Sequence, residues 1–375
     1  MSDPILAFIT AFTLVYFAIP SIINVARKKH LMDEPKDRGA HHRSVPTLGG
    51  VAIFAGVLFS VVLWTPFQVF TELQYILCAV IILFLVGVKD DLDPISPWKK
   101  LIAQIIAACI LIFKANIMFT GMHGVFGIEG LPYWVCVLFT LFTILVIINA
   151  INLIDGINGL SGSTVVLVSV TLGVWFYIVD RMELTILALS LAGATVAFLK
   201  YNFTPARIFM GDTGSLFLGT VCSILVIEFV ELQGSLTEGR FVFHSAPAVA
   251  MAIMILPLFD TLRVFVIRIS QGKSPFQPDR NHIHHLVLDA GFTHMQATGI
   301  LILTNVVFIL MVLSLDTIGS FPLILLSIGL AVILTNYLDQ YVQRRGRRAV
   351  IAADVPSQDI TSEEPSSEAE VHEYI

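Results

Sequence analysis

The sequence predicts an all-α fold, a polytopic membrane bundle of about eleven transmembrane helices. Apolar residues make up 56% of the 375 residues and charged residues only 13%, whereas a soluble domain averages about 25% charged residues. The apolar stretches lack the alternating hydrophobicity of β-barrel strands. Helices are then the structure that satisfies the backbone inside lipid, so the composition argues against a soluble protein and against a barrel.

Each predicted helix corresponds to one apolar run, and several runs approach the ~20 residues that cross a ~30 Å hydrocarbon core. The third run is the shortest. A basic segment does not precede the first run, so we expect a retained helix rather than a cleaved signal peptide. The runs cover residues 4–25, 46–64, 74–88, 101–119, 132–151, 162–179, 184–200, 214–231, 247–267, 296–315 and 319–338.

Lysine and arginine are concentrated in the odd-numbered connections, and this predicts the orientation. The even-numbered connections hold only Lys114, Arg181 and Arg240, whereas basic residues follow the first, third, seventh, ninth and last helices. Because basic connections stay in the cytoplasm, we expect the N-terminus outside and the C-terminus inside.

We expect residues 1–340 to form a transmembrane catalytic domain with five cytoplasmic active-site loops. Residues 341–375 are expected to form a cytoplasmic tail, first basic and then acidic. The tail segment 358–373 is rich in Ser, Glu and Pro and cannot bury enough apolar surface to fold alone. The arginines of 344–348 suit a lipid-headgroup anchor better than a nucleic-acid site.

Three aspartates, Asp90, Asp91 and Asp93, crowd the cytoplasmic end of the third predicted helix. The helix macrodipole and mutual repulsion both disfavour negative charge there, unless a cation joins the carboxylates. A hard divalent ion prefers such oxygen ligands, so the motif indicates a metal site. Lys99 and Lys100 open the next helix. The alternative is a solvated acidic turn.

The third cytoplasmic loop combines amides, an acid and glycines. At helical spacing Asn149, Asn152 and Asp155 line one side of the end of the fifth helix. Gly156 and Gly159 then let the backbone turn closely beneath a ligand. An ordinary helix end with a glycine turn is the alternative.

The fourth loop, residues 209–215, leads directly into the eighth predicted helix. Asp212 or Thr213 can cap that helix. A helix N-terminus also binds anions, and Asp212 at its edge could hold a metal ion against a bound phosphate.

The first and fifth loops are basic and histidine-rich. In the first, Arg38 and His42 could hold a phosphate, although a basic loop that only sets topology is the alternative. In the fifth, Arg280 precedes a group of histidines whose neighbours suit phosphate. Cysteines and a helix-spaced His-Glu pair are missing from this motif, which disfavours structural zinc. The histidines are His282, His284 and His285.

Taken in order on one membrane face, the five motifs resemble the polyprenyl-phosphate N-acetylhexosamine-1-phosphate transferase superfamily (glycosyltransferase family 4), and within it the WecA/TagO branch. The resemblance runs from about Asp33 to His285. The sequence of residues 274–285 favours this branch over the phospho-MurNAc-pentapeptide transferases of the same superfamily, which remain the alternative.

The resemblance implies that undecaprenyl phosphate attacks the β-phosphorus of a UDP-sugar, with UDP-GlcNAc as the first choice. The products are UMP and a polyprenyl-diphosphate sugar, the first membrane step of cell-surface polysaccharide synthesis. The resemblance also implies Mg²⁺, or Mn²⁺ in its place, as cofactor. The expected partners are the UDP-sugar, undecaprenyl phosphate and membrane lipid, without nucleic acid; a homodimer stays open. The location implied is the bacterial cytoplasmic membrane, with the active site facing the cytoplasm.

Roles follow from the resemblance residue by residue. Asp91 and Asp212 are expected to hold the metal ion, Asp90 to orient or deprotonate the lipid phosphate, and Asp155 to position uridine or the metal. Asn158 stands where many relatives have a second acid, and an amide cannot supply charge or take a proton. The expected substrate-binding residues are Asn149, Asn152, Asn158, Lys99, Arg280, His282, His284, His285, Arg38 and His42.

The rival from another class is an ion-coupled membrane transporter, in which acids inside the membrane would form a relay. The position of the acids argues against this alternative. They lie at the ends of predicted helices and not in the middle of the membrane: Asp90, Asp91, Asp155 and Asp212. A scaffold protein would leave these acids and the loop glycines unexplained.

Overall fold

The computed structural model describes residues 2–29, 31, 45–67, 70–236, 241–274 and 281–353. Within these residues the chain is helical, and β pairing is limited to isolated bridges, such as the one between Gly121 and Gly130. The helices are α1 (Ser2–Lys28), α2 (Gly49–Trp64), α3 (Phe70–Leu92), α4 (Pro97–Phe113), η2 (Val125–Gly127), α5 (Tyr133–Leu153), α6 (Leu160–Ile178), α7 (Met182–Asn202), α8 (Gly211–Ser235), α9 (Ala246–Ile253), α10 (Ile255–Ser270), α11 (Ile283–Asp289), α12 (His294–Ser314), η3 (Asp316–Ile318) and α13 (Ser320–Ala353).

Every predicted apolar run lies on a helix, which confirms the all-α membrane class. Among the described residues, eight helices are long and apolar enough to cross a membrane, or up to nine if a bent pair counts as one span. Helix α2 has 16 residues and α4 has 17, lengths of only about 24 and 26 Å. The total of about eleven crossings and the orientation therefore stay predictions.

The bent pair is the ninth predicted run, which the structure divides into α9 and α10 at an angle of 79°. Pro257 lies in the first turn of α10 and lacks the N–H group that would bond to the carbonyl of Ile253. The chain therefore leaves helical geometry at Met254 and restarts in a new direction.

Helix α8 lies at the centre of the bundle and packs against other helices on several sides. Of its apolar window 83% is buried, a larger share than in the other candidate spans of the described chain. It contacts α2, α3, α5, α6 and α9. Since α8 is surrounded by other helices, the residues at its first turn are held firmly against their neighbours.

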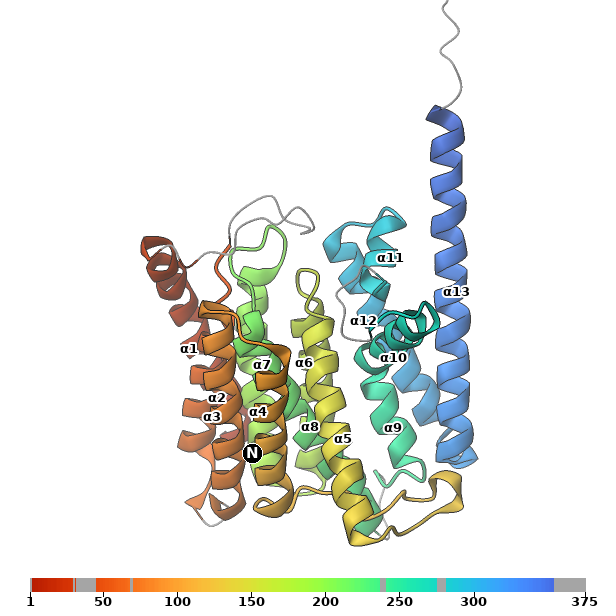
Figure 1. Ribbon diagram of the computed structural model, residues 1–375. Coiled ribbons are helices and arrows are strands. Elements are labelled where there is room, and N and C mark those ends of the chain that lie inside the picture. The colour runs from red at the N-terminus through yellow and green to blue at the C-terminus, as the bar shows by residue number, and fades with distance from the viewer. Residues whose placement is uncertain are drawn as a thin grey trace, which may run out of the picture.

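The ends of the helices define two faces (Figure 1). The loop between α5 and α6 and the short helix α11 both lie at the upper end of the view, and α13 projects beyond them. The N-terminus lies toward the other end. The segments that carry the predicted motifs and are described here thus gather at one end of the bundle.

Residues 354–375, most of the predicted tail, lie outside the described residues, and α13 continues as far as Ala353. The predicted division at residue 340 stays untested.

Candidate active site

Asp91, at the end of α3, caps the first turn of α8. Its Oδ1 accepts a hydrogen bond from the backbone N–H of Asp212 at 2.8 Å. Its Oδ2 accepts from the backbone N–H of Thr213 at 2.9 Å and from the Thr213 hydroxyl at 2.5 Å. An acid from a distant helix therefore satisfies N–H groups that a helix N-terminus leaves unpaired. The positive end of the α8 macrodipole also stabilises the carboxylate.

Glycines allow α3 and α2 to come this close to α8. A Cβ on Gly87, one turn before Asp91, would lie 2.5 Å from the Cα of Thr213. A Cβ on Gly50 of α2 would likewise meet the backbone of Gly214. The backbones thus touch directly, and larger side chains would separate Asp91 from the α8 N-terminus.

Lys100 joins the acids of the second and fourth loops. Its Nζ lies 2.6 Å from Asp90 Oδ2 and 2.5 Å from Asp212 Oδ2. The other oxygen of Asp90 accepts from the N–H of Ile95 at 2.9 Å. With Asp91 beside them, three carboxylates share one ammonium group, so negative charge is in excess. Such a group attracts a further cation or a cation-bound substrate.

Lys99, the neighbour that the sequence analysis selected, is exposed instead. The pKa of Asp93 lies below its ordinary value mainly because of an ion pair with Lys89. The positive charge of Lys99 lowers this pKa further. Asp93 is itself exposed and turned outward. The structure therefore includes Lys100 in the site and leaves Lys99 at its edge.

Asn152 belongs to the same cluster as predicted. Its Nδ2 donates to Asp212 Oδ1 at 3.0 Å and to the Ser215 hydroxyl at 2.8 Å. Asn149 lies one turn deeper, where it donates to Gln104 Oε1 at 2.8 Å. Asn152 thus orients the Asp212 carboxylate, whereas Asn149 joins α5 to α4.

Asp155 lies in the connection between α5 and α6 and accepts a hydrogen bond from the Ser161 hydroxyl. Burial raises the pKa of Asp155 to about 7, and the nearby negative charges of Asp212 and Asp91 act in the same direction. This carboxyl therefore changes its charge near neutral pH, as an acid or base in a transfer reaction does.

Asn158 is turned away from this cluster. Its side chain is buried, and its Nδ2 donates to the Thr204 hydroxyl at 3.0 Å. Its backbone carbonyl accepts from the Thr298 hydroxyl at 2.9 Å. These contacts hold the loop in place, and they do not support the predicted substrate-binding role.

The histidine motif is oriented by a buried acid that the sequence analysis did not select. Asp260 of α10 accepts from the N–H of Ile283 at 2.7 Å and lies 2.8 Å from His282 Nδ1. The carboxylate thereby fixes both the ring of His282 and the start of α11. The motif offers no hint of this partner, since Asp260 lies more than twenty positions earlier in the chain.

His284 reaches across to the Asp155 loop. Its ring lies against Gly156, where a Cβ would collide with Nε2. Only 2% of the residue is exposed, and neither ring nitrogen has a hydrogen-bond partner among the residues the structure describes. Burial lowers the pKa of His284 to about 3, so the ring is neutral at pH 7. His285 follows, with its ring centroid 4.3 Å from that of His284.

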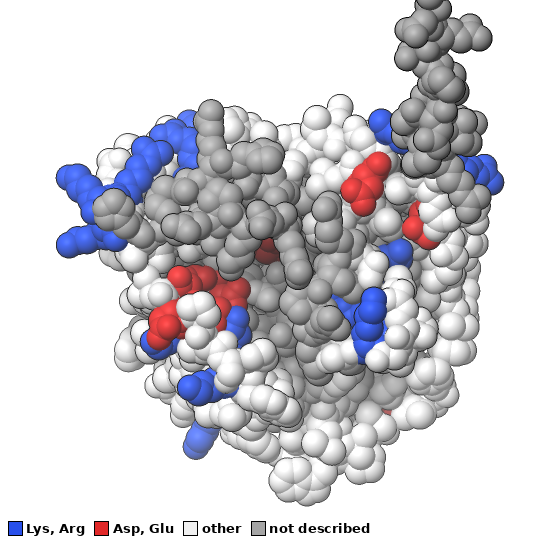
Figure 2. Space-filling view, turned by 45° about the horizontal axis from the view of Figure 1, so that its top comes forward, with Lys and Arg blue, Asp and Glu red and all other residues white. Residues whose placement is uncertain are grey.

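The described part of the site faces outward at one end of the molecule. Figure 2 shows acidic side chains gathered in a patch on this face, with basic side chains beside it. In the described ranges, groups of three or more His, Cys, Asp or Glu residues arranged to hold a metal ion are absent. The predicted residues Arg38, His42 and Arg280 lie outside the described residues.

Comparison with known proteins finds a matching family and similar sequences. Residues 73–230 match the sequence model of glycosyl transferase family 4, and this range holds the four predicted catalytic aspartates. A probable undecaprenyl-phosphate N-acetylglucosaminyl 1-phosphate transferase of Bacillus subtilis is 30% identical over 305 residues, 81% of this chain and 82% of the relative. An undecaprenyl-phosphate alpha-N-acetylglucosaminyl 1-phosphate transferase of Pasteurella multocida is 34% identical over 301 residues, 78% of this chain and 80% of the relative.

An undecaprenyl-phosphate alpha-N-acetylglucosaminyl 1-phosphate transferase of Salmonella typhi is 30% identical over 281 residues, 73% of each chain. The similarity in all three cases covers more than two thirds of both proteins. The chain therefore belongs to glycosyl transferase family 4, as its five motifs predict.

Proposed function

We propose that the chain transfers GlcNAc 1-phosphate from UDP-GlcNAc to undecaprenyl phosphate. A phosphate oxygen of the acceptor bonds to the β-phosphorus of the nucleotide sugar, and the bond from that phosphorus to the bridging oxygen breaks. UMP leaves with the bridging oxygen, and undecaprenyl-diphosphate-GlcNAc remains. The names of the relatives support this reaction. The observation that carries it is the joining of Asp90, Lys100 and Asp212 at the α8 N-terminus.

The donor set fits a hard divalent cation, Mg²⁺ or Mn²⁺. Asp90 and Asp212 offer carboxylate oxygens at the position where the Lys100 ammonium bridges them, and the Asn152 amide lies next to Asp212. Asp91 uses both of its oxygens on the α8 cap, which leaves one lone pair on Oδ1 and none on Oδ2. When bound, the ion would neutralise the diphosphate of the nucleotide sugar.

The charge of each residue at the site indicates its role in the reaction. Two anions must approach each other, so Lys100 and the α8 N-terminus lower the electrostatic cost of that approach. A phosphate with a second pKa near 6 is largely a dianion at pH 7, so Asp90 has to orient the acceptor rather than take a proton from it. The neutral ring of His284 can donate one hydrogen bond and accept another, which suits the sugar or the diphosphate.

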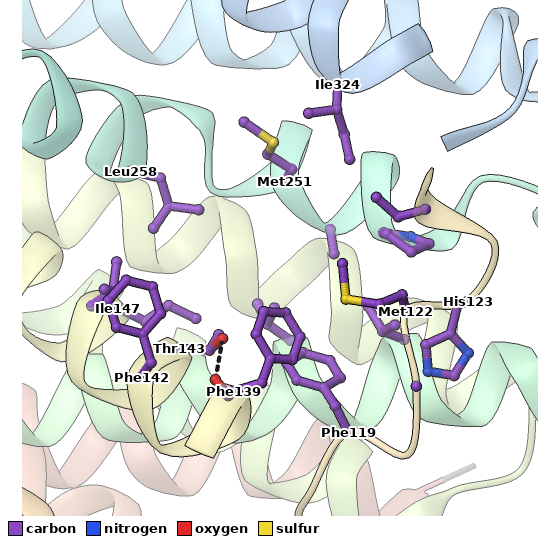
Figure 3. A pocket seen from close by; sticks show the side chains of 17 residues that line it. Phe119, Met122, His123, Phe139, Phe142, Thr143, Ile147, Met251, Leu258 and Ile324 are labelled. Atoms are coloured by element: carbon purple, nitrogen blue, oxygen red, sulfur yellow. Dashed lines mark hydrogen bonds between the residues drawn. The ribbon is translucent and has the colours of Figure 1, made fainter. Parts of the chain in front are cut away.

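An apolar cavity of about 400 Å³ supports the binding of the acceptor's hydrocarbon tail (Figure 3). Ile147 and Leu258 line it, and each lies two residues from a polar residue near the site, Asn149 and Asp260. Thr143 also lines it, but its hydroxyl donates to a carbonyl of its own helix at 2.9 Å. The wall is therefore suited to hydrocarbon, and it extends along the bundle as far as Phe119 and His123 in the connection between α4 and α5.

The site belongs at the cytoplasmic surface of the bacterial membrane in this proposal. The distribution of Lys and Arg supports it, because the acid-bearing turns after α3 and α7 belong to the basic connections. A soluble nucleotide sugar and a lipid phosphate meet there without either crossing the bilayer.

The test is incubation of the purified chain with radiolabelled UDP-GlcNAc, undecaprenyl phosphate and Mg²⁺. We expect labelled lipid and UMP in equal amounts. An ion-coupled transporter would form neither product. UDP-MurNAc-pentapeptide in a parallel reaction distinguishes the related branch of the family, and we expect it to be inert.

A further inference from the structure

The proposed site is built from two parts of the chain that must keep a fixed register. Helices α3, α4, α5 and α8 supply the acids and Lys100, whereas α10 and α11 supply Asp260 and the histidines. Helix α11 has only seven residues, too few to hold its position alone. Its contacts with neighbouring elements therefore decide where His284 lies.

Helix α12 follows α11 and is joined to it by a well-defined corner. The Thr293 hydroxyl accepts from the N–H of Gln296, and the Gln296 side chain accepts from the N–H of Thr293 at 3.0 Å. This capping box fixes the direction in which α12 leaves the corner. A hydrogen bond between α12 and the part of the chain that carries the acids therefore also restrains α11.

Thr298 makes such a hydrogen bond. It is buried in the second turn of α12, and its hydroxyl donates to the backbone carbonyl of Asn158 at 2.9 Å. Asn158 belongs to the loop that carries Asp155 and Gly156. The hydrogen bond thus connects the helix next to the histidine motif with the loop that the histidine ring touches.

The loop between α5 and α6 is also held on its other side. The hydrogen bond from Thr298 therefore fixes the position of α12 relative to this loop. The Asn158 side chain donates to Thr204 at 3.0 Å, and the N–H of Gly159 donates to Asn202 Oδ1 at 2.7 Å. Both partners lie at the end of α7 or just after it. The Asn158 carbonyl is then a fixed acceptor to which α12 is attached.

The position of α11 relative to the Asp155 loop matters because the ring of His284 packs directly against Gly156. Its ring lies where a Cβ on Gly156 would be, two residues from Asn158. A small sliding of α11 and α12 along the loop would move the ring of His284 away from Gly156 and so from the Asp155 loop.

We propose that Thr298 is a positioning residue for the nucleotide sugar, because its bond to the Asn158 carbonyl sets His284 against the Asp155 loop. The inference rests on the proposed function. It concerns the donor, because the acceptor phosphate is assigned to Asp90 and Lys100 on the other side of the site.

The test compares Thr298→Val, which keeps the shape and removes the donor, with Thr298→Ser, which keeps the hydroxyl. Thr304→Val is the matched control, since Thr304 lies on the same helix with its hydroxyl bonded to Ile300 at 2.8 Å. We expect Thr298→Val to raise KM for UDP-GlcNAc about tenfold, as the loss of one buried hydrogen bond does. KM for undecaprenyl phosphate should stay unchanged, and Thr298→Ser and Thr304→Val should behave like the wild type.

Equal KM values for UDP-GlcNAc in Thr298→Val and the wild type would overturn the inference, as would a parallel rise for both substrates. If Thr298→Val does not accumulate in membranes, Thr298→Cys replaces it, with a weaker donor and a smaller expected rise. A wild-type chain that forms no labelled lipid removes the proposed function and this inference with it. An active wild type with unaffected variants removes the inference alone.

Discussion

At the residue scale, a single lysine is paired with the two acids Asp90 and Asp212 of the site. Lys100 contacts Asp90 and Asp212 together, and each of these carboxylates has only one further hydrogen-bond donor among the described residues. An ammonium group in that position holds the two acids at the distance that a shared cation or phosphate needs. The roles of Lys99 and Lys100 should therefore differ sharply.

Substitution of the two lysines measures this difference. We expect Lys100→Met to lower kcat/KM at least about 100-fold, since it removes a charge that faces the acceptor phosphate. Lys99→Met, the matched control one residue away, should stay within about twofold of the wild type. The measurement is the initial rate of UMP release. Equal losses in the two variants would contradict the assignment of Lys100.

Asp155 gives the fold a pH dependence of known sign. Its folded pKa of about 7 exceeds the ordinary value near 4, so the native state binds a proton that the unfolded state releases between these pH values. Stability from this group is complete below about pH 4 and is lost as the pH rises through about 7.

Thermal unfolding in detergent tests the sign. Asp155→Asn should match the wild type near pH 4 and unfold at a higher temperature than the wild type near pH 8. The control is Asp93→Asn, because the pKa of Asp93 is lowered and its charge does not change in this range. A difference between Asp155→Asn and the wild type that is constant with pH would rule out the raised pKa.

Sequence reasoning identified the converging acids and missed several of their partners, for physical reasons. Asp91, Asp212 and Asn152 could be predicted because they end or begin helices on one face. Successive helical residues point about 100° apart, so only the packing of α4 could choose between Lys100 and Lys99. The pairing of Asp260 with the histidine motif depends on a fold contact that spacing does not encode.

At the element scale, the α3–α8 contact is the feature on which the site is built. Backbone contact at Gly87 brings Asp91 within hydrogen-bond distance of the α8 N-terminus. The spacing of residues along the chain does not indicate which helices touch at Gly87. The break between α9 and α10 was also unexpected, because a continuous apolar run does not reveal a change of direction.

Gly87→Ala tests this contact. Helix propensity alone would favour alanine by about 1 kcal/mol, but the added Cβ would meet the Thr213 backbone. We expect overpacking to destabilise the fold by roughly 1–3 kcal/mol and activity to fall with it. Gly329→Ala, in α13 where a Cβ would have open space, should be neutral or stabilising. Thermal unfolding of the two variants gives the comparison, and an undisturbed Gly87→Ala would contradict the close approach.

At the scale of the whole molecule, one central helix connects the membrane interior to the chemistry. Helix α8 is buried along its length and presents its N-terminus, capped by Asp91, to the site. The apolar cavity beneath lies beside the same helix, since Val226 and Val230 line it. A lipid acceptor and a soluble donor can therefore meet at one end of a rigid bundle.

The central claim is that Asp212, at the start of α8, takes part in the transfer itself. The most direct measurement is the rate of labelled lipid formation by Asp212→Asn against Asp93→Asn, with Mg²⁺ varied for both. Asp93 is an exposed acid at the end of the same α3 cluster, paired with Lys89. We predict a loss of at least about 100-fold for Asp212→Asn together with a weaker dependence on Mg²⁺, and near wild-type rates for Asp93→Asn. Full activity in Asp212→Asn would contradict the account.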